Sequence, residues 1–320
     1  MKQEYEFKVC TYCTTYNHAP YIVDAMNGFV MQKTTFPFVA IINDDASTDG
    51  EPDIIRNYLS DHFCEPFRKE DTDEYSLICA KHRQNQNCFF VVFLLKYNHY
   101  SIKKDFYSYW TEWLDNSKYH AVCEGDDCWI RPEKLQLQCD FLDTHVDYSM
   151  CCHNAVVWNV ASERVDNFSS IEEGELSSST VISKWCAPTA SLLYRKELTA
   201  YPEWLVKIYS GDLALILRCL NAGRVFYFDR LMSIYRKNSS VSSMSAKMGD
   251  DCFIFVLEQH ILLLSSFDEG TNYRFHNDII KTVREKKQII SYTKTSWIGR
   301  LIEPYFYKLI ARRIRRMIKA

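Results

Sequence analysis

The sequence lacks the features that mark membrane-spanning and nucleic-acid-binding proteins. No run of 18 residues is free of charged and polar interruptions, and the nearest one, Cys252–Phe267, contains Glu258, Gln259 and His260. This composition predicts a buried helix rather than a membrane span. Acidic residues slightly outnumber basic ones, and the net charge is -3. Because affinity for nucleic acid rests on Lys and Arg side chains that neutralise phosphates, we expect no nucleic-acid partner.

A secretory leader and a disulfide framework are also missing. Residues Met1–Val9 enter a strand-like segment without a basic region and an apolar run, so we expect no signal peptide and a cytoplasmic protein. The 13 cysteines are odd in number, lie scattered along a core-rich chain and include the adjacent pair Cys151 and Cys152. We therefore expect reduced thiols. Cys10 and Cys13 have the spacing of a redox or zinc motif, but on a strand their side chains would point to opposite faces.

What the first part of the chain does contain is an alternation of strand and helix patterns. The expected strands are Phe7–Cys13, Phe38–Asn43, Tyr75–Lys81 and Tyr119–Glu124. The expected helices are Ala19–Gln32 and Asp49–Asp61, the second with Asp49 as its N-cap. Repeated units of this kind favour an α/β fold with a mostly parallel sheet and right-handed crossovers.

The second part is less regular and becomes helical towards its end. Its expected elements are a helix at Pro132–His145, strands at Met150–Val160 and Val225–Tyr235, a Ser-rich loop at Phe168–Thr180 and a helix near Asp212–Asn221. Beyond Ser242 the pattern is helical, with breaks near Gly270, Gly299 and Pro304. These patterns predict a domain over residues 1–242, with halves 1–127 and 128–242, and a helical C-terminal extension over 243–320.

Carboxylates gather directly after two of the expected strands. Asp44 and Asp45 follow the second strand, and Glu124, Asp126 and Asp127 stand at the end of the fourth. In open α/β sheets, ligands bind beyond the carboxyl ends of the strands. Three carboxylates within four residues repel one another unless a cation offsets them, and Mg²⁺ or Mn²⁺ suits such oxygen ligands together with nucleotide phosphates. A solvated acidic turn and a helix cap remain alternatives.

Three ordered motifs carry a family resemblance. They are Thr15-Tyr16-Asn17-His18, the run from Asp44 to Asp49, and Glu124-Gly125-Asp126-Asp127-Cys128-Trp129 with Pro132, Lys134, Leu135 and Gln138 downstream. In this order they resemble glycosyltransferase family 2, over about Phe7 to Val241. The resemblance implies a GT-A fold, a nucleotide-diphosphate sugar donor that is usually UDP-linked, a divalent cation and inversion at the anomeric carbon.

The resemblance also implies roles in binding the donor nucleotide. Thr14 and Tyr16 would line the nucleotide pocket, with Tyr16 beside the base. Asp45 would accept a hydrogen bond from uracil, and Asp44 would support the loop. Glu124 stands where the family frequently has an aspartate, and it would lie near the ribose.

Further implied roles concern the diphosphate and the chemistry. Asp127 would bind Mn²⁺ or Mg²⁺ directly, and Asp126 would face the ribose or the metal shell. Arg236 and Lys237 would lie near the diphosphate. Inverting displacement needs a base for the acceptor hydroxyl, and Asp212, which opens an apolar helix, is the expected catalytic residue. An ordinary helix cap is the alternative for Asp212.

Some aromatic and polar residues in the chain fit either a sugar contact or a place in the core. Trp129 and Trp185 could stack on a sugar face, and His153 with Asn154 could touch an acceptor. Each of them could equally be a core residue. The pattern alone leaves both alternatives open.

These implications predict an inverting hexosyltransferase that acts on a surface glycan, such as a capsule, O-antigen or exopolysaccharide unit, or on a lipid-linked saccharide. A non-catalytic nucleotide-sugar or glycan-binding module is the first alternative, against which the intact Asp127 and Asp212 argue. A nucleotidyltransferase is the second, but it would need a Gly-rich loop with basic residues, and Thr14–Pro20 contains no glycine.

The C-terminal segment Lys294–Ala320 is strongly basic. It carries eight Lys and Arg residues against one Glu, which gives a charge of +7. Apolar residues from Trp297 to Ile318 recur among these cations with the spacing of an amphipathic helix. Such a helix can lie on an anionic membrane surface, which predicts a peripheral protein on the inner face of the membrane. Packing against the domain or another subunit is the alternative.

Overall fold

The computed structural model describes residues 6–199, 202, 205, 211–237 and 250–294. Within this part of the chain the strands are β1 (Phe7–Thr15), β2 (Phe38–Asp44), β3 (Arg68–Asp71), β4 (Tyr75–Lys81), β5 (Cys88–Leu95), β6 (Ser117–Val122), β7 (Cys128–Trp129), β8 (Tyr148–Asn159), β9 (Arg164–Asn167), β10 (Gly174–Glu175), β11 (Leu193–Arg195) and β12 (Arg224–Lys237). The α-helices are α1 (Ile22–Val30), α2 (Glu51–His62), α3 (Thr111–Asp115), α4 (Lys134–Thr144), α5 (Ser178–Ser183), α6 (Gly211–Ala222), α8 (Asp250–Gly270) and α9 (His276–Lys294).

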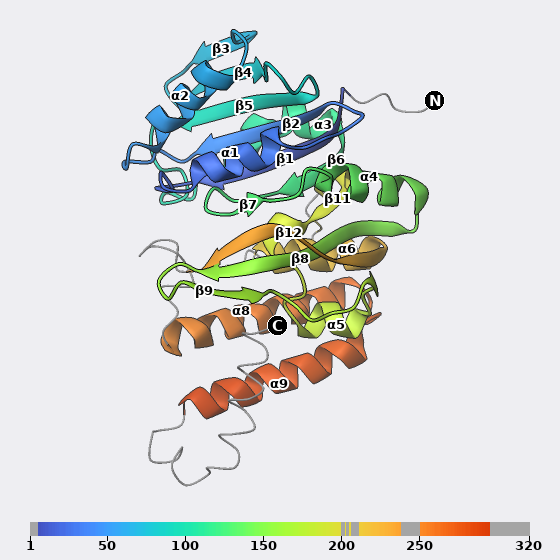
Figure 1. Ribbon diagram of the computed structural model, residues 1–320. Coiled ribbons are helices and arrows are strands. Elements are labelled where there is room, and N and C mark those ends of the chain that lie inside the picture. The colour runs from blue at the N-terminus through green and yellow to red at the C-terminus, as the bar shows by residue number, and fades with distance from the viewer. Residues whose placement is uncertain (1–5, 200–201, 203–204, 206–210, 238–249, 295–320) are drawn as a thin grey trace.

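One mixed sheet runs through the molecule in the order β10-β12-β8-β11-β6-β1-β2-β5-β4-β3 (Figure 1). Its centre is parallel, because β1 pairs with β6 and β2, and β2 pairs with β5. Antiparallel strands extend it on both sides, from β5 to β4 and β3 and from β6 to β11. The expected α/β fold with a parallel core is confirmed.

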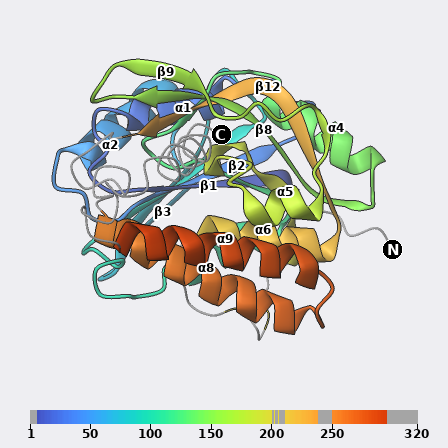
Figure 2. The same ribbon diagram turned by 90° about the horizontal axis from the view of Figure 1, so that it is seen from below.

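Helices cover both faces of the sheet, which buries most residues of its central strands. Every residue of β2 is buried, as expected for a parallel strand that is covered on both faces. Figure 2 shows α1, α2 and α4 on one side of the sheet and α6, α8 and α9 on the other. The first group packs its apolar residues into one core cluster, and the second group packs into another.

Two local expectations about the first part of the chain were wrong. The run Cys88–Leu95 forms β5, a strand that the sequence analysis did not place, and β4 is consequently antiparallel to it. A continuous apolar run has no periodicity that separates a strand from a helix, and the short connection between β4 and β5 permits only a hairpin. Helix α2 begins at Glu51 rather than Asp49, after a left-handed Gly50 with φ 91°.

The cysteines have the predicted reduced state. All 13 are free in the structure. Cys10 and Cys13 are both fully buried, and they belong to core clusters on opposite faces of β1. Their separation excludes a shared metal or a disulfide, so the spacing of this motif reflects strand alternation alone.

The C-terminal helices α8 and α9 form an adjacent pair that packs on the α6 side of the sheet (Figure 2). The expected break near Gly270 is confirmed, because α8 ends there. The breaks at Gly299 and Pro304 and the basic segment from residue 295 onward lie outside the described residues, so the membrane-surface role stays a prediction. In the described part of the chain, no helix has the length and apolar character to cross a membrane.

The proposed division of the chain at residues 127 and 242 also stays a prediction. Strands from residues 1–127 and from residues 128–242 belong to the same sheet.

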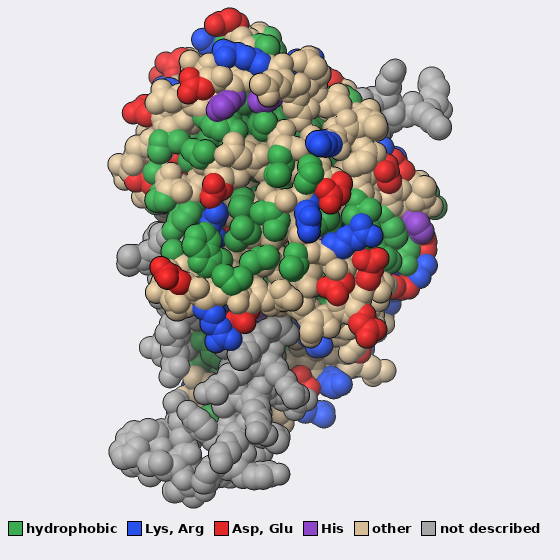
Figure 3. Space-filling view, viewed as in Figure 1, with side chains coloured by type: hydrophobic (Ala, Val, Ile, Leu, Met, Phe, Trp, Pro, Cys, Tyr) green, Lys and Arg blue, Asp and Glu red, His purple; other side chains and the backbone are tan. Residues whose placement is uncertain are grey.

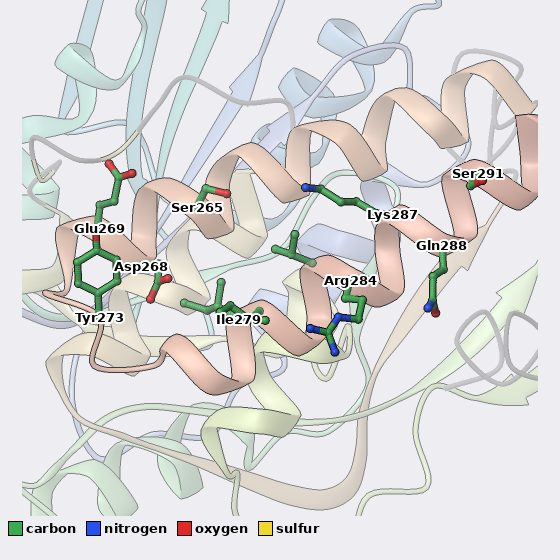
Figure 4. A pocket seen from close by; sticks show the side chains of 11 residues that line it. Ser265, Asp268, Glu269, Tyr273, Ile279, Arg284, Lys287, Gln288 and Ser291 are labelled. Carbon is green, nitrogen blue, oxygen red and sulfur yellow. The ribbon is translucent and has the colours of Figure 1, made fainter.

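An open cavity of about 660 Å³ lies between α8 and α9 (Figure 4). Its labelled residues include Glu269, Arg284 and Lys287, and none of the predicted site residues lines it.

On the face drawn in Figure 3, hydrophobic side chains gather across the middle while acidic and basic ones are intermixed around them.

Candidate active site

The loop after β1, which contains Tyr16 to His18, is held in place by the loop after β2, which contains Asp45 to Asp49. Glu51 is fully buried at the start of α2 and accepts hydrogen bonds from the Thr15 hydroxyl and, at 2.8 Å, from the backbone N–H of His18. Ser47 donates its hydroxyl to Glu51 at 2.9 Å and accepts the backbone N–H of Asn17 at 2.8 Å. These bonds hold the two loops together at the carboxyl edge of the parallel strands. Thr15 therefore has a structural role.

Asp44 and Asp45 at the end of β2 have different surroundings. Asp44 is fully buried and accepts the backbone N–H of Ser47 at 3.2 Å, and burial raises the pKa of its carboxyl to about 6. This geometry fits the predicted loop support. Asp45 accepts the backbone N–H groups of His99 and Tyr100, at 2.7 and 3.0 Å. Asp45 thus anchors the loop after β5, and its contact with a nucleotide base stays a prediction.

Gly125 allows the acidic motif, Glu124 to Asp127, to pack closely against the end of β1. Its backbone N–H donates to the Thr14 carbonyl at 3.0 Å. A β-carbon on this residue would lie 2.1 Å from the Thr15 hydroxyl oxygen, so only glycine permits the approach. Thr14 is half-buried here, and Tyr16, the next residue but one, is 39% exposed. Thr14, one of the two residues predicted to line the nucleotide pocket, therefore contacts the carboxylate motif, and the pocket itself stays a prediction.

Asp127 is held by the last strand of the sheet. It is buried, and one carboxylate oxygen accepts the backbone N–H of Arg236 at 2.8 Å, while the other, Oδ2, has no hydrogen-bond partner. Burial raises the pKa of the Asp127 carboxyl, and the nearby charge of Asp126 raises it further. A buried carboxylate oxygen without a partner is costly, and a bound cation would relieve that cost.

Arg236 has side-chain contacts that the sequence did not predict. Its side chain is only 2% exposed, donates to the Asp126 carbonyl at 2.8 Å and forms an ion pair with Asp24 at 2.5 Å. These contacts hold the Asp126-Asp127 turn, and a role of Arg236 near the diphosphate stays a prediction. The ion pair of Arg236 with Asp24 could not be predicted from the sequence, because the two residues are 212 positions apart.

Glu124 and Asp212 come from the two halves of the chain and share one electrostatic environment. Burial raises the pKa of the Glu124 carboxyl to about 8, with smaller contributions from the charges of Asp126 and Asp212. Asp212 lies in the first turn of α6, where burial raises the pKa of its carboxyl and the Trp185 side chain hydrogen-bonds to it. The fold therefore brings the predicted base near the acidic motif.

His18 adds a nitrogen beside the carboxylates. Its Nε2 atom lies 4.0 Å from a carboxylate oxygen of Asp126, and both side chains are mostly buried. Among the described residues, no three His, Cys, Asp or Glu side chains form a group that could hold a metal by themselves. Mn²⁺ and Mg²⁺ typically take only one or two carboxylates when they also bind nucleotide phosphates. Asp126 and Asp127 fit that kind of shared site.

The raised pKa of Glu124 predicts how the stability of the metal-free protein depends on pH. Because the folded state keeps this carboxyl protonated, the parent loses stability as pH rises from about 4.5 towards 8. Glu124→Gln cannot ionise, so its melting temperature should exceed that of the parent by roughly 5 °C at pH 8.5 and by little at pH 4.5.

Thermal unfolding across that pH range checks the prediction for Glu124. Glu133→Gln, at an exposed position, serves as the control and should melt like the parent at each pH. A Glu124→Gln advantage that stays constant from pH 4.5 to 8.5 would contradict the prediction.

Several residues that build the site were not assigned from the sequence. Glu51 joins the two loops, His18 approaches Asp126, and Trp185 contacts Asp212. His18 lies within a motif that was recognised, so its position was a usable signal. Glu51 gave none, since a helix-start glutamate is common in any protein. Trp185 was a candidate for a sugar contact, but its hydrogen bond to Asp212 was not predicted.

The comparison with curated proteins finds relatives without an assigned activity. No family model matches the chain. It is 26% identical over 226 residues to the uncharacterized proteins Rv1520 of Mycobacterium tuberculosis and Mb1547 of Mycobacterium bovis. The aligned region covers 70% of this chain and 57% of each relative, so the chain spans little more than half of their length.

Solved structures similar to this chain include a mannosyltransferase and the protein TarS. Mannosyltransferase PcManGT from Pyrobaculum calidifontis, in complex with GDP-Man and Mn²⁺, aligns with 98% of this chain and 84% of its own at a TM-score of 0.53 and 11% identity. S. aureus TarS 1-349 in complex with UDP-GlcNAc aligns with 84% of this chain and 73% of its own at a TM-score of 0.49 and 17% identity. The likeness to PcManGT confirms what the motifs implied about architecture: the chain has the GT-A fold of glycosyltransferases.

Proposed function

We propose that this protein is an inverting glycosyltransferase that moves a sugar from a nucleotide diphosphate to a saccharide acceptor. The proposal rests on the proximity of the Asp212 carboxyl to those of Glu124, Asp126 and Asp127 at the carboxyl edge of the parallel core. Ligands bind at this edge in open α/β sheets. The mannosyltransferase with the same fold was solved with a nucleotide sugar and Mn²⁺, which supports the same class of donor here.

The first half of the chain supplies the donor site in this proposal. Tyr16 is exposed beside the motif loops and offers an aromatic face to the base. Asp45 has spare acceptor capacity on its oxygens beyond the two backbone bonds it makes, so it can accept an N–H from uracil. UDP is thus the proposed nucleotide. Thr14 and Glu124 lie where the ribose would reach the sheet edge.

The acidic motif binds the cation and diphosphate. Asp127, through its unpartnered Oδ2, and Asp126 would hold Mn²⁺ or Mg²⁺. When bound, the ion neutralises negative charge that develops on the leaving diphosphate. Arg236 holds the Asp126-Asp127 turn in place through two hydrogen bonds. Its backbone N–H donates to the Asp127 carboxylate, and its side chain donates to the Asp126 carbonyl. The buried surroundings strengthen these electrostatic interactions, because little water screens them.

Asp212 performs the proton transfer. As the acceptor hydroxyl attacks the anomeric carbon, the Asp212 carboxylate takes its proton, and the bond to the diphosphate breaks on the opposite face. A raised pKa makes a carboxylate a stronger base at neutral pH, and burial raises the pKa of Asp212. The displacement needs no covalent enzyme intermediate. A hexose donor and a surface-glycan or lipid-linked acceptor complete the proposal.

A thermal-shift screen tests the proposed donor. UDP, GDP, dTDP and CMP sugars are each added with and without Mn²⁺, and a ligand that binds the native state raises the melting temperature. We expect the largest shift with a UDP-sugar and Mn²⁺ together, followed by release of UDP when acceptor or water is present. Stabilisation without any release of nucleotide would favour a binding module, and no response to any nucleotide sugar would overturn the proposal.

Asp45→Ala should weaken nucleotide binding by about 1–3 kcal/mol, the usual loss when a hydrogen-bonding partner is removed. Metal affinity should change much less, because Asp45 belongs to the base side of the site. Calorimetric titration with UDP in the presence of Mg²⁺ measures both effects.

Asp45→Ala also removes the acceptor for two backbone N–H groups, so unfolding of the variant must be followed in parallel. Asp73→Ala, at an exposed position, is the control. Parental UDP affinity in a folded Asp45→Ala protein would place the base pocket elsewhere.

A further inference from the structure

Three aromatic side chains form a cluster next to Asp212. The ring centroids of Phe168 and Trp185 are 4.9 Å apart, those of Trp185 and Tyr235 are 5.3 Å apart, and those of Phe168 and Tyr235 are 6.0 Å apart. All three contacts are edge-on, with interplanar angles of 75° to 87°. Edge-to-face contacts of this kind are favourable and restrict each ring to one orientation.

The cluster has one exposed member and two supporting ones. Trp185 is 38% exposed, whereas Phe168 is 3% exposed and Tyr235 is half-buried. By contrast Trp129, the other tryptophan considered for a sugar contact, is buried in the core, where its indole N–H donates to a backbone carbonyl at 2.8 Å. Trp185 therefore offers a fixed aromatic surface to solvent, and Trp129 does not.

The cluster lies near both the acidic motif and the proposed base. Tyr235 precedes Arg236, whose backbone N–H binds Asp127, on the same strand β12. Burial raises the pKa of the Tyr235 hydroxyl, and the charges of Asp127, Glu124, Asp126 and Asp212 raise it further, which indicates that these carboxyl groups lie near it. Trp185 itself hydrogen-bonds to the Asp212 carboxylate. A molecule resting on Trp185 would have its hydroxyl groups beside the base.

We propose that Trp185, supported by Phe168 and Tyr235, is the platform on which a pyranose ring of the acceptor stacks. This inference rests on the proposed function and adds the substrate class. A pyranose presents a flat face of C–H groups, which matches a rigid aromatic surface, while its rim of hydroxyls points outward. An open-chain alditol has no such face. The platform therefore selects a cyclic sugar acceptor over a linear polyol.

Saturation-transfer NMR on the whole chain tests the platform without knowledge of the natural acceptor. The probes are methyl β-glucopyranoside, methyl β-galactopyranoside and methyl α-mannopyranoside, with ribitol as the linear comparison, all at millimolar concentration in Mg²⁺ buffer. The parent should transfer saturation to ring C–H protons of at least one pyranoside and not to ribitol. In Trp185→Ala the transfer should fall by about tenfold or more, because the aromatic face that the sugar would stack on is removed.

Two further variants keep the test decisive. Trp185→Leu fills most of the same volume without an aromatic face and should also lose transfer, whereas Trp185→Phe should keep much of it. Phe67→Ala, which is 63% exposed near the far edge strand β3, is the control and should behave like the parent. No transfer in the parent for any pyranoside, or equal transfer in the parent and a folded Trp185→Leu, would overturn the platform.

A failure of the platform can be told apart from a failure of the proposed function. Binding of nucleotide sugar with Mg²⁺ is measured by calorimetry on the same samples, and Trp185→Leu should leave it unchanged. If the donor binds normally while pyranosides ignore Trp185, only the platform is wrong. If no nucleotide sugar binds to the parent, the glycosyltransferase proposal itself fails.

Discussion

Asp212→Asn is expected to lower kcat by about 100-fold or more, the usual contribution of a positioned general base. Asparagine has nearly the same shape as aspartate, but its amide cannot accept the acceptor's proton at neutral pH. Fold and donor binding should survive, so the loss should fall on kcat rather than on donor affinity. Steady-state release of nucleotide, measured with saturating donor, gives both quantities.

A helix-terminus role for Asp212 would give the opposite pattern. Asparagine is as good as aspartate near a helix start, so activity would stay at the parental level and only Asp212→Ala would lose stability. Asp229→Asn is the matched control, because Asp229 is an acidic residue of the second half that accepts a hydrogen bond from Asn154 at 2.8 Å. Parental turnover in Asp212→Asn with a large loss in Asp229→Asn would transfer the base role to Asp229.

Asp127→Asn is expected to reduce metal-dependent donor affinity by about 100-fold or more. Losing a partner in the outer coordination shell typically weakens metal sites by 10- to 100-fold, and removing a charged direct ligand should exceed that. The Asn oxygen can still accept the backbone N–H of Arg236, so the turn should keep its shape. Removing a buried charge also relieves repulsion with Asp126, and the free protein should be at least as stable as the parent.

Calorimetric titration of UDP-sugar with and without Mn²⁺ measures the effect of Asp127→Asn, and Asp53→Asn, an exposed change on α2, is its control. Asp127→Ala provides an internal comparison, because it leaves the Arg236 N–H without a partner at a cost of about 1–3 kcal/mol in stability. If Asp127→Asn binds donor and metal as tightly as the parent, the metal assignment is wrong.

The ends of the parallel strands were the most predictable part of the molecule. Apolar runs that stop at carboxylates, as at Asp44 and Glu124, locate both the strands and the edge at which we propose that the donor binds. The strand β4 was predicted with its observed bounds, but its direction was not, because the next strand, β5, carries no alternation to identify it. Whether a strand pairs parallel or antiparallel depends on the strand beside it, and the sequence of one strand alone does not contain that information.

The contacts that finish the site could not be predicted, because they join segments far apart in the chain. The engagement of Arg236 depends on Asp24, and the exposure of Trp185 depends on how Phe168 and Tyr235 pack. Motif resemblance named Arg236 as a site residue but did not predict its contacts with Asp24 and the Asp126 carbonyl. Pairwise packing of this kind leaves no periodic signal in the sequence.

The hydrogen bond between Asp127 and the backbone of Arg236 joins residues 109 positions apart, and the ion pair of the same arginine with Asp24 spans 212. Contacts with such large separations form late in folding, because a long loop must close before they yield any stabilisation. During synthesis, the acidic turn leaves the ribosome long before the strand that fixes it. The acidic turn is therefore completed only after β12 has been made, which delays its assembly in the nascent protein.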